Sequence, residues 1–195
     1  MPSSGSTPNP RARPRAVRLF VVLVGEDHPK ACTGRRLLRR GLARRVSRLE
    51  GIAPAPLILD PYASDPLAGA DRRAAVRGGI LAVDCSWNRL AERGRFPATE
   101  TEGRSRGLRR RLPILIATNP QHYGRLAQLN TVEALAAALY LVGRTEEAAH
   151  LLEGFRGAGA FLAVNRERLD AYARARDTTA VLAAERQLFG GGPEA

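Results

Sequence analysis

The chain has 195 residues, 44% of them apolar, which is enough to bury a core in one domain of ordinary size or in two small ones. Its formal net charge of +12 predicts a polyanionic partner, with nucleic acid ahead of an acidic membrane surface. No apolar run is long enough to span a membrane and the two cysteines form no disulfide framework, so we expect a cytoplasmic protein without membrane association.

The first elements along the chain are a polar segment, a strand and a helix. Pro, Ser and Arg dominate residues 1–16, so a disordered basic tail is expected there. The apolar, β-branched run at 17–24 predicts a buried strand. Over residues 34–49, Leu and Val recur on one face and Arg on the others, which predicts an amphipathic helix with Thr33 as its N-cap.

Three more apolar runs predict strands in the middle of the chain. They lie at 56–60, 79–85 and 113–119, and a polar stretch at 88–111 separates the last two. None of the runs alternates polar with apolar residues as a half-exposed strand does. They therefore favour a parallel sheet that is covered on both faces.

From residue 130 onward the apolar residues recur with the period of a helix. Asn130 and Glu133 predict a capping box at the helix start, and Gly143 predicts its end. A second helix is expected from Thr145, as its N-cap, to Gly157. Two further helices are expected at about 160–176 and 178–188, so the fold class is α/β with a helical C-terminal end.

Polar residues follow each predicted strand. Asp60 comes after the second strand, Asp84 and Trp87 after the third, and Asn119 after the fourth. Ligands of open parallel sheets bind outside the carboxyl ends of the strands, so these clusters predict a small-molecule site. Ordinary turns, which are rich in the same residue types, are the alternative. The histidines and cysteines lack the spacing of metal ligands, and no metal is expected.

Three motifs in the chain resemble those of a known family. HPKACTG at 28–34, DCSW at 84–87 and NPQHYG at 119–124 occur in the order seen in the ribosome-biogenesis aminocarboxypropyltransferases, which modify rRNA in archaea and eukaryotes. The resemblance covers about residues 17–175, and the combination is far more specific than any one motif.

The fold that this resemblance implies has two parts. A small N-terminal α/β part would occupy residues 17–78. A SPOUT-like, trefoil-knotted part with the C-terminal helices would occupy 79–190 and bind S-adenosylmethionine. Hydrophobic pattern alone does not predict a knot, because knots are rare exceptions among folds.

The activity that the resemblance implies is the transfer of the 3-amino-3-carboxypropyl group of S-adenosylmethionine to rRNA. The acceptor would be N3 of an N1-methylpseudouridine in the small-subunit rRNA or its precursor, and methylthioadenosine would leave. The resemblance also implies a monomer. A SPOUT-like RNA methyltransferase and a non-catalytic RNA-binding ribosome assembly factor are the alternatives.

The resemblance places seven residues at the cofactor. Trp87 is expected beside the methyl and the sulfonium, because an aromatic face fills space and attracts a cation. Asp84, the expected catalytic residue, would lie beside the aminocarboxypropyl arm. A carboxylate is a weak base for an imide proton, so we expect Asp84 to position the arm rather than to act as a full general base. The other five are Thr33, Val83, Leu112, Thr131 and Ala127, the last at a position where many family members have Tyr.

Seven arginines are expected to contact the phosphates of the rRNA, while the target base enters the pocket unstacked. Three belong to the predicted helix beside Thr33, and a solvated basic face is the alternative interpretation there. The other four precede the predicted strand at 113–119. The seven are Arg35, Arg36, Arg39, Arg106, Arg109, Arg110 and Arg111.

Overall fold

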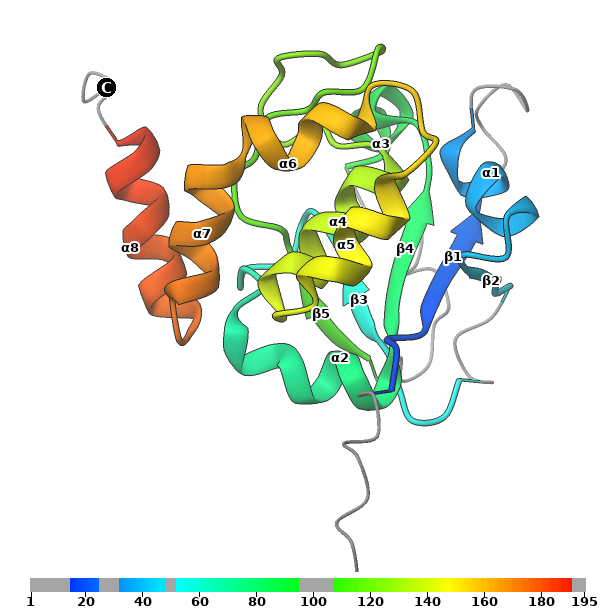
Figure 1. Cartoon of the computed structure of the whole chain (residues 1–195), viewed down its shortest axis with the longest axis horizontal. Coiled ribbons are helices and arrows are strands. Elements are labelled where there is room, and N and C mark those ends of the chain that lie inside the picture. The colour runs from blue at the N-terminus through cyan, green and yellow to red at the C-terminus, as the bar shows by residue number, and fades with distance from the viewer. Residues whose placement is uncertain (1–14, 25–31, 48–51, 95–106, 191–195) are drawn as a thin grey trace, which may run out of the picture.

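A parallel β-sheet lies at the centre of the computed structural model, which describes residues 15–24, 32–47, 52–94 and 107–190 (Figure 1). The strand order is β2-β1-β4-β3-β5, and every neighbouring pair is parallel. The predicted parallel sheet is confirmed, as are the strands expected at 17–24, 56–60 and 79–85. The strands are β1 (Leu19–Leu23), β2 (Arg44–Arg45), β3 (Leu57–Leu59), β4 (Ile80–Asp84) and β5 (Leu108–Arg110).

Helices pack on the sheet and then continue away from it at the C-terminal end (Figure 1). α4 contacts β4, α5 packs along α4, α7 contacts α4, and α8 packs on α7. No helix of the described ranges is long and apolar enough to cross a membrane. The helices are α1 (Thr33–Arg39), α2 (Arg72–Gly78), α3 (Trp87–Arg93), α4 (Thr131–Leu141), α5 (Thr145–Leu152), α6 (Phe161–Val164), α7 (Arg166–Arg174) and α8 (Thr178–Phe189).

The two faces of the sheet belong to separate hydrophobic clusters. On one face, Val21 and Ala82 join the main core, to which α4 contributes most of its length. On the other face, Phe20 and Leu81 pack with Leu90 of α3. Successive residues of a strand point to opposite faces, so burial on both sides explains why the strands read as continuous apolar runs.

Capping residues in the sequence predict the start of α4 correctly, but they misplace both ends of α5. Asn130 accepts a hydrogen bond from the N–H of Glu133 (2.9 Å), and the Glu133 carboxylate accepts one from the N–H of Asn130 (3.0 Å), so the predicted capping box is confirmed. For α5, Thr145 is the first helical residue rather than the N-cap. The helix ends at Leu152 rather than Gly157, because Gly154 already takes a left-handed conformation (φ 71°).

The helix expected over 34–49 is wrong in its second half. It ends at Arg39, and Gly41 has a φ of 67°, which turns the chain out of the helix. Arg44 and Arg45 then form the edge strand β2 beside β1. The predicted N-cap is also corrected, because Cys32 caps α1 and accepts from the N–H of Arg35 (3.3 Å).

The strand expected at 113–119 is not part of the sheet. β5, from within the polar stretch at 88–111, takes that edge of the sheet instead. The following segment, residues 111–130, contains only isolated bridges, one of them between Ile116 and Leu126. Its backbone groups therefore need hydrogen-bond partners other than a neighbouring strand.

Buried polar side chains from the helices supply part of those partners. Glu133, at the start of α4, is fully buried and accepts hydrogen bonds from both the N–H and the hydroxyl of Thr118 (2.8 Å each). Asn165, between α6 and α7, is also fully buried and pairs with the N–H and the carbonyl of Ile116 (2.8 Å each). The helix expected over 160–176 is divided at Asn165 into α6 and α7, and the side chain of Asn165 takes the place of a strand partner for Ile116.

Helix α8 and helix α7 hold the start of the same segment. Glu185 of α8 accepts from the N–H of Ile114 (2.9 Å) and binds the Arg111 guanidinium through two hydrogen bonds (2.7 and 2.8 Å). These bonds raise the pKa of Arg111. The hydroxyl of Tyr172 in α7 donates to the carbonyl of Ile114 (3.1 Å), and its burial raises the pKa of that hydroxyl. The C-terminal helices thus support an irregular segment whose only β-pairing in the described residues is the two isolated bridges.

The sheet combines strands from both predicted parts of the chain. β1, β2 and β3 come from residues 17–78, β4 and β5 come from 79–190, and β4 lies between β1 and β3. The division at residue 78 stays a prediction. The predicted disordered tail falls mostly on residues 1–14, which lie outside the described residues.

Candidate functional site

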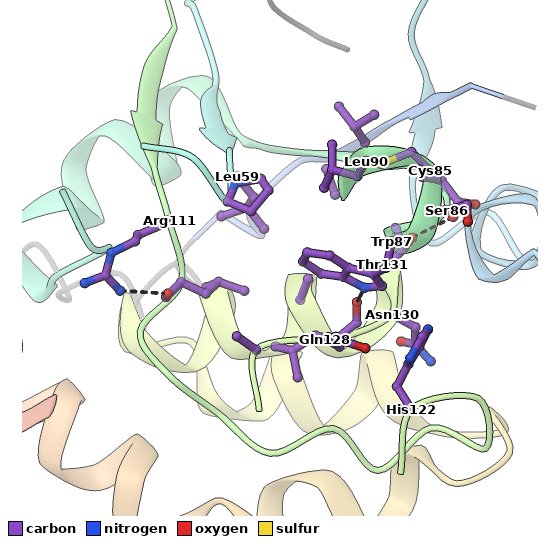
Figure 2. Close-up of a pocket in the computed structure, with 18 of the residues that line it drawn as sticks. Leu59, Cys85, Ser86, Trp87, Leu90, Arg111, His122, Gln128, Asn130 and Thr131 are labelled. Atoms are coloured by element: carbon purple, nitrogen blue, oxygen red, sulfur yellow. Dashed lines mark hydrogen bonds between the residues drawn. The ribbon is translucent and has the colours of Figure 1, made fainter. Parts of the chain in front are cut away.

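A cavity of about 670 Å³ opens at the carboxyl ends of β3 and β4, where the sequence predicts a ligand site (Figure 2). Its walls come from the start of α1, the turn after β3, the end of β4 with α3, and the segment before α4. The Trp87 indole extends into the opening. The seven predicted cofactor residues all line this cavity: Thr33, Val83, Asp84, Trp87, Leu112, Ala127 and Thr131.

The Asp84 carboxylate is held by donors from two other elements. Its Oδ2 accepts hydrogen bonds from the N–H of Gly34 (2.8 Å) and from the Cys32 thiol (2.8 Å), both at the start of α1. Its Oδ1 accepts one from the hydroxyl of Thr131, the first residue of α4 (2.9 Å). Only 7% of Asp84 is exposed. These bonds fix the orientation of the carboxylate in the cavity wall.

Gly34 is required by this arrangement. A Cβ atom at position 34 would lie 2.2 Å from Oδ2 of Asp84 and 2.8 Å from its Cγ, well inside contact distance. The glycine therefore brings the backbone N–H of α1 within hydrogen-bond reach of the carboxylate. The glycine of the HPKACTG segment is thus explained by a close approach rather than by an unusual φ.

Cys32 acts as a neutral donor in the same cluster. The thiol is buried, and burial together with the hydrogen bond to Asp84 raises its pKa from 9.0 to about 11. It therefore stays protonated around neutral pH and can donate to the carboxylate. Cys85 is half buried and also lines the cavity.

The Trp87 indole is hydrogen-bonded at its nitrogen and also lines the cavity. Its indole Nε1 donates to the backbone carbonyl of Leu129 (2.9 Å), so α3 is tied to the segment before α4. The ring packs against the second hydrophobic cluster while it lines the cavity. The sequence did not reveal this contact, because the acceptor is a backbone atom 42 residues away.

Ala127 also lines the cavity. It has a φ of 59°, a left-handed conformation that costs a non-glycine residue about 1–2 kcal/mol, and its N–H donates to the carbonyl of Leu115 (2.8 Å). Its methyl side chain supplies no aromatic ring at this position. Leu112 lines the cavity just beyond β5.

Most of the described arginines predicted to contact RNA have partners within the protein. Arg109 pairs with Asp60 (2.8 Å), Arg110 with Asp71 (3.0 Å), and Arg111 with Glu185. Arg106 lies outside the described residues.

Of the three arginines predicted in α1, one has a partner within the protein and two are exposed. Arg36 donates to the carbonyl of Gly154 (2.8 Å) and lies over the ring of Phe155. Arg35 and Arg39 are exposed on the helix surface. The predicted basic surface is therefore sparser than the count of arginines suggests.

The charge of the cavity suits a cationic ligand. Within the described ranges, no cationic side chain forms an ion pair with Asp84, whose three hydrogen-bond donors are neutral. A buried carboxylate without a cation retains attraction for a positive charge, and an aromatic face nearby adds to it. A sulfonium with an ammonium-bearing arm has this charge, so the residues present fit S-adenosylmethionine. No group of three or more metal-binding side chains occurs in the same ranges.

Comparisons with known proteins agree on one family. Residues 57–189 match the family model described as ribosome biogenesis protein, C-terminal. The 16S rRNA aminocarboxypropyltransferase of Methanopyrus kandleri is 40% identical over 89% of this chain and 99% of its own length. The 18S rRNA aminocarboxypropyltransferase of Schizosaccharomyces pombe is 36% identical, over 85% of this chain and 54% of that protein. A solved structure of a SAM-dependent rRNA:acp-transferase from Vulcanisaeta distributa has a TM-score of 0.77 and 36% identity, covering 89% of each chain.

We expect Gly34→Ala to destabilise the protein by about 1–3 kcal/mol, because the added methyl overlaps Asp84. In an Asp84→Ala background the two closest contacts, with Oδ2 and Cγ, are absent and only the contact of 2.9 Å with Cβ remains, so the same substitution should cost less. Chemical unfolding of the four proteins gives the coupling free energy between the two positions. If the two substitutions changed the free energy of unfolding additively, the close contact between positions 34 and 84 would be contradicted.

Proposed function

The chain belongs to the ribosome biogenesis protein family whose curated relatives are named rRNA aminocarboxypropyltransferases, and from that premise we propose that it transfers a 3-amino-3-carboxypropyl group from S-adenosylmethionine to N3 of an N1-methylpseudouridine in small-subunit rRNA. The observation that carries the proposal is the Asp84 carboxylate, fixed by neutral donors beside Trp87 in one cavity.

The cavity residues divide between the two ends of the donor. When bound, S-adenosylmethionine supplies an electrophilic carbon where its aminocarboxypropyl arm joins the sulfonium. Asp84 and Thr33 would bind the arm, and Trp87 would cover the methyl group. Val83 and Leu112 would contact the nucleoside through backbone groups. Thr131 and Ala127 would line the adenine side.

Which carbon reacts depends on which one faces the acceptor. A sulfonium has three carbons next to sulfur, and attack requires alignment at close range. A wall of aromatic atoms over the methyl would exclude it from the acceptor and leave the longer arm exposed. The position of Trp87 in the cavity supports arm transfer over methyl transfer.

Asp84 is better suited to positioning than to proton transfer. Both of its oxygens already accept hydrogen bonds from fixed donors. One lone pair of Oδ1 remains to accept a hydrogen bond from an ammonium, whereas a carboxylate is a weak base for the N3 imide proton. We therefore assign Asp84 to holding the ammonium of the arm.

The RNA would be bound electrostatically around the cavity. Arg35 and Arg39 are exposed beside Thr33, so they are the stronger candidates for phosphate contacts. The weaker candidates are those whose guanidinium groups already bind acceptors within the protein: Arg36, Arg109, Arg110 and Arg111. Arg106 is included from the sequence alone.

The proposal extends to features that the resemblance implies. These are a SPOUT-like, trefoil-knotted arrangement of residues 79–190 and a monomeric enzyme in the cytoplasm. The parallel sheet with its helical end and the similarity to the Vulcanisaeta distributa structure support the first of them.

The activity is tested with S-adenosylmethionine carrying one label in the methyl group and another in the carboxyl carbon. Incubation with small-subunit rRNA should move the carboxyl label alone into RNA. Transfer of only the methyl label would indicate a methyltransferase. Transfer of neither label, with RNA still bound, would indicate an assembly factor.

Substitutions at Asp84 and Trp87 should separate transfer from cofactor binding. We expect Asp84→Asn to lower the transfer rate by tenfold or more and S-adenosylmethionine affinity by less, because a misplaced arm loses alignment. Trp87→Ala should weaken affinity itself, since it removes the ring beside the sulfonium. Calorimetry gives the affinities and single-turnover assays give the rates. A normal rate in Asp84→Asn would remove Asp84 from the mechanism.

The combined change Arg35→Ala and Arg39→Ala should reduce RNA affinity and its salt dependence. Loss of two phosphate contacts lowers the slope of log affinity against log salt by about 1.5. Arg176→Ala is the control, because Arg176 is exposed and comes two residues before α8, a helix on the opposite side of the molecule from α1 (Figure 1). If the unmodified protein, the double variant and the control had equal salt slopes, Arg35 and Arg39 would not belong to the RNA-binding surface.

A further inference from the structure

Tyr62 is an exposed aromatic residue in the wall of the cavity. It follows β3, it is 51% exposed, and it lies in the cavity lining with Leu90 and Ala91 of α3. The other large apolar side chains of comparable exposure in the described residues, Tyr123 among them, do not line this cavity. Single exposed apolar residues are common on protein surfaces, so exposure alone indicates no function.

What distinguishes Tyr62 is that it is held at both ends. Its hydroxyl donates to the backbone carbonyl of Leu90 (3.0 Å), and its N–H donates to Oδ1 of Asp60 (2.9 Å). The other oxygen of Asp60 binds Arg109 (2.8 Å), so the turn is fixed to β5 as well. The ring is therefore presented in one orientation, with its polar atom already bonded inside the protein.

A fixed ring with an exposed face is suited to stacking. Stacking on a preorganised aromatic loses little side-chain entropy, and every nucleobase offers a π-face. Proteins that recognise unstacked RNA bases use aromatic side chains in this way. Because the hydroxyl is already bonded to Leu90, the ring face is the part of Tyr62 left for a ligand.

The place of Tyr62 in the cavity favours an RNA base over the adenine of the donor. Of the residues proposed for the adenosine, Ala127 and Thr131 lie just before and at the start of α4 and Leu112 lies just beyond β5, whereas Tyr62 is bonded to α3. Leu90 lies three residues beyond Trp87, about 4.5 Å along the helix axis. A base on Tyr62 would thus lie beside the reacting group rather than at it.

We propose that Tyr62 is a stacking platform for the nucleobase next to the target uridine, and that it holds this base out of the RNA helix while the target enters the cavity. The inference rests on the proposed function, because it takes the substrate to be rRNA. Asp60 and Arg109 are then positioning residues for the platform, which gives the Asp60–Arg109 ion pair a role in substrate recognition.

The test compares Tyr62→Phe with Tyr62→Leu. Both variants lose the hydroxyl bond to Leu90, and only Phe keeps an aromatic ring, so the comparison separates stacking from any effect on folding. With an rRNA fragment that carries the acceptor uridine, Tyr62→Leu should bind about 5- to 50-fold more weakly than Tyr62→Phe. S-adenosylmethionine affinity, measured alone by calorimetry, should agree within twofold between the two.

Tyr123→Leu is the control for a generic exposed aromatic, since Tyr123 is 72% exposed and outside the cavity lining. It should bind the RNA fragment as the unmodified protein does. Equal RNA affinity of Tyr62→Phe and Tyr62→Leu would overturn the inference. So would a parallel loss of S-adenosylmethionine affinity in Tyr62→Leu, which would assign the ring to the adenine. In both cases arm transfer by the unmodified protein would leave the proposed function standing.

Discussion

The carboxylate of Asp84 is the point on which both the fold and the site depend. It lies at the end of β4 and accepts hydrogen bonds from the start of α1 and the start of α4, so one side chain joins three elements that are distant in sequence. Burying a charge is unfavourable unless hydrogen bonds compensate for it. Three neutral donors compensate in part and leave the negative charge in the cavity wall. The same group thus holds the wall together and attracts a cation to it.

The second constraint is the irregular segment from Arg111 to Asn130. It forms much of the cavity wall without belonging to the sheet, so its backbone groups would be costly to bury unpaired. Glu133, Asn165 and Glu185 provide part of the missing partners, and the segment supplies others from its own backbone, such as the bond from the N–H of Ala117 to the carbonyl of Arg125 (2.9 Å). The helical end of the chain therefore supports the site, since its buried polar side chains hold the cavity wall in place.

These internal bonds also change how the basic composition should be interpreted. The chain has a large excess of Arg over acidic residues. Several of its acidic side chains nevertheless form ion pairs with arginines near the cavity. Arg109 and Arg110 bind Asp60 and Asp71 and so connect β5 to residues that follow β3, whereas Arg111 binds Glu185 of α8. Net charge therefore predicts the class of partner, whereas only the ion pairs show which arginines are available to it.

The sequence by itself determined the elements whose signals are local. Continuous apolar runs predicted β1, β3 and β4, the Asn130–Glu133 capping box placed α4, and family motifs named the residues that line the cavity. It misplaced β5 and the end of α1, where a two- or three-residue strand and a single glycine decide the outcome. Only the tertiary structure decided how those residues serve the site, because the bonds to Asp84, Trp87 and Arg111 join atoms 42 to 74 residues apart. Periodicity and caps depend on neighbours along the chain, whereas these contacts depend on which surfaces the packed sheet and helices bring together.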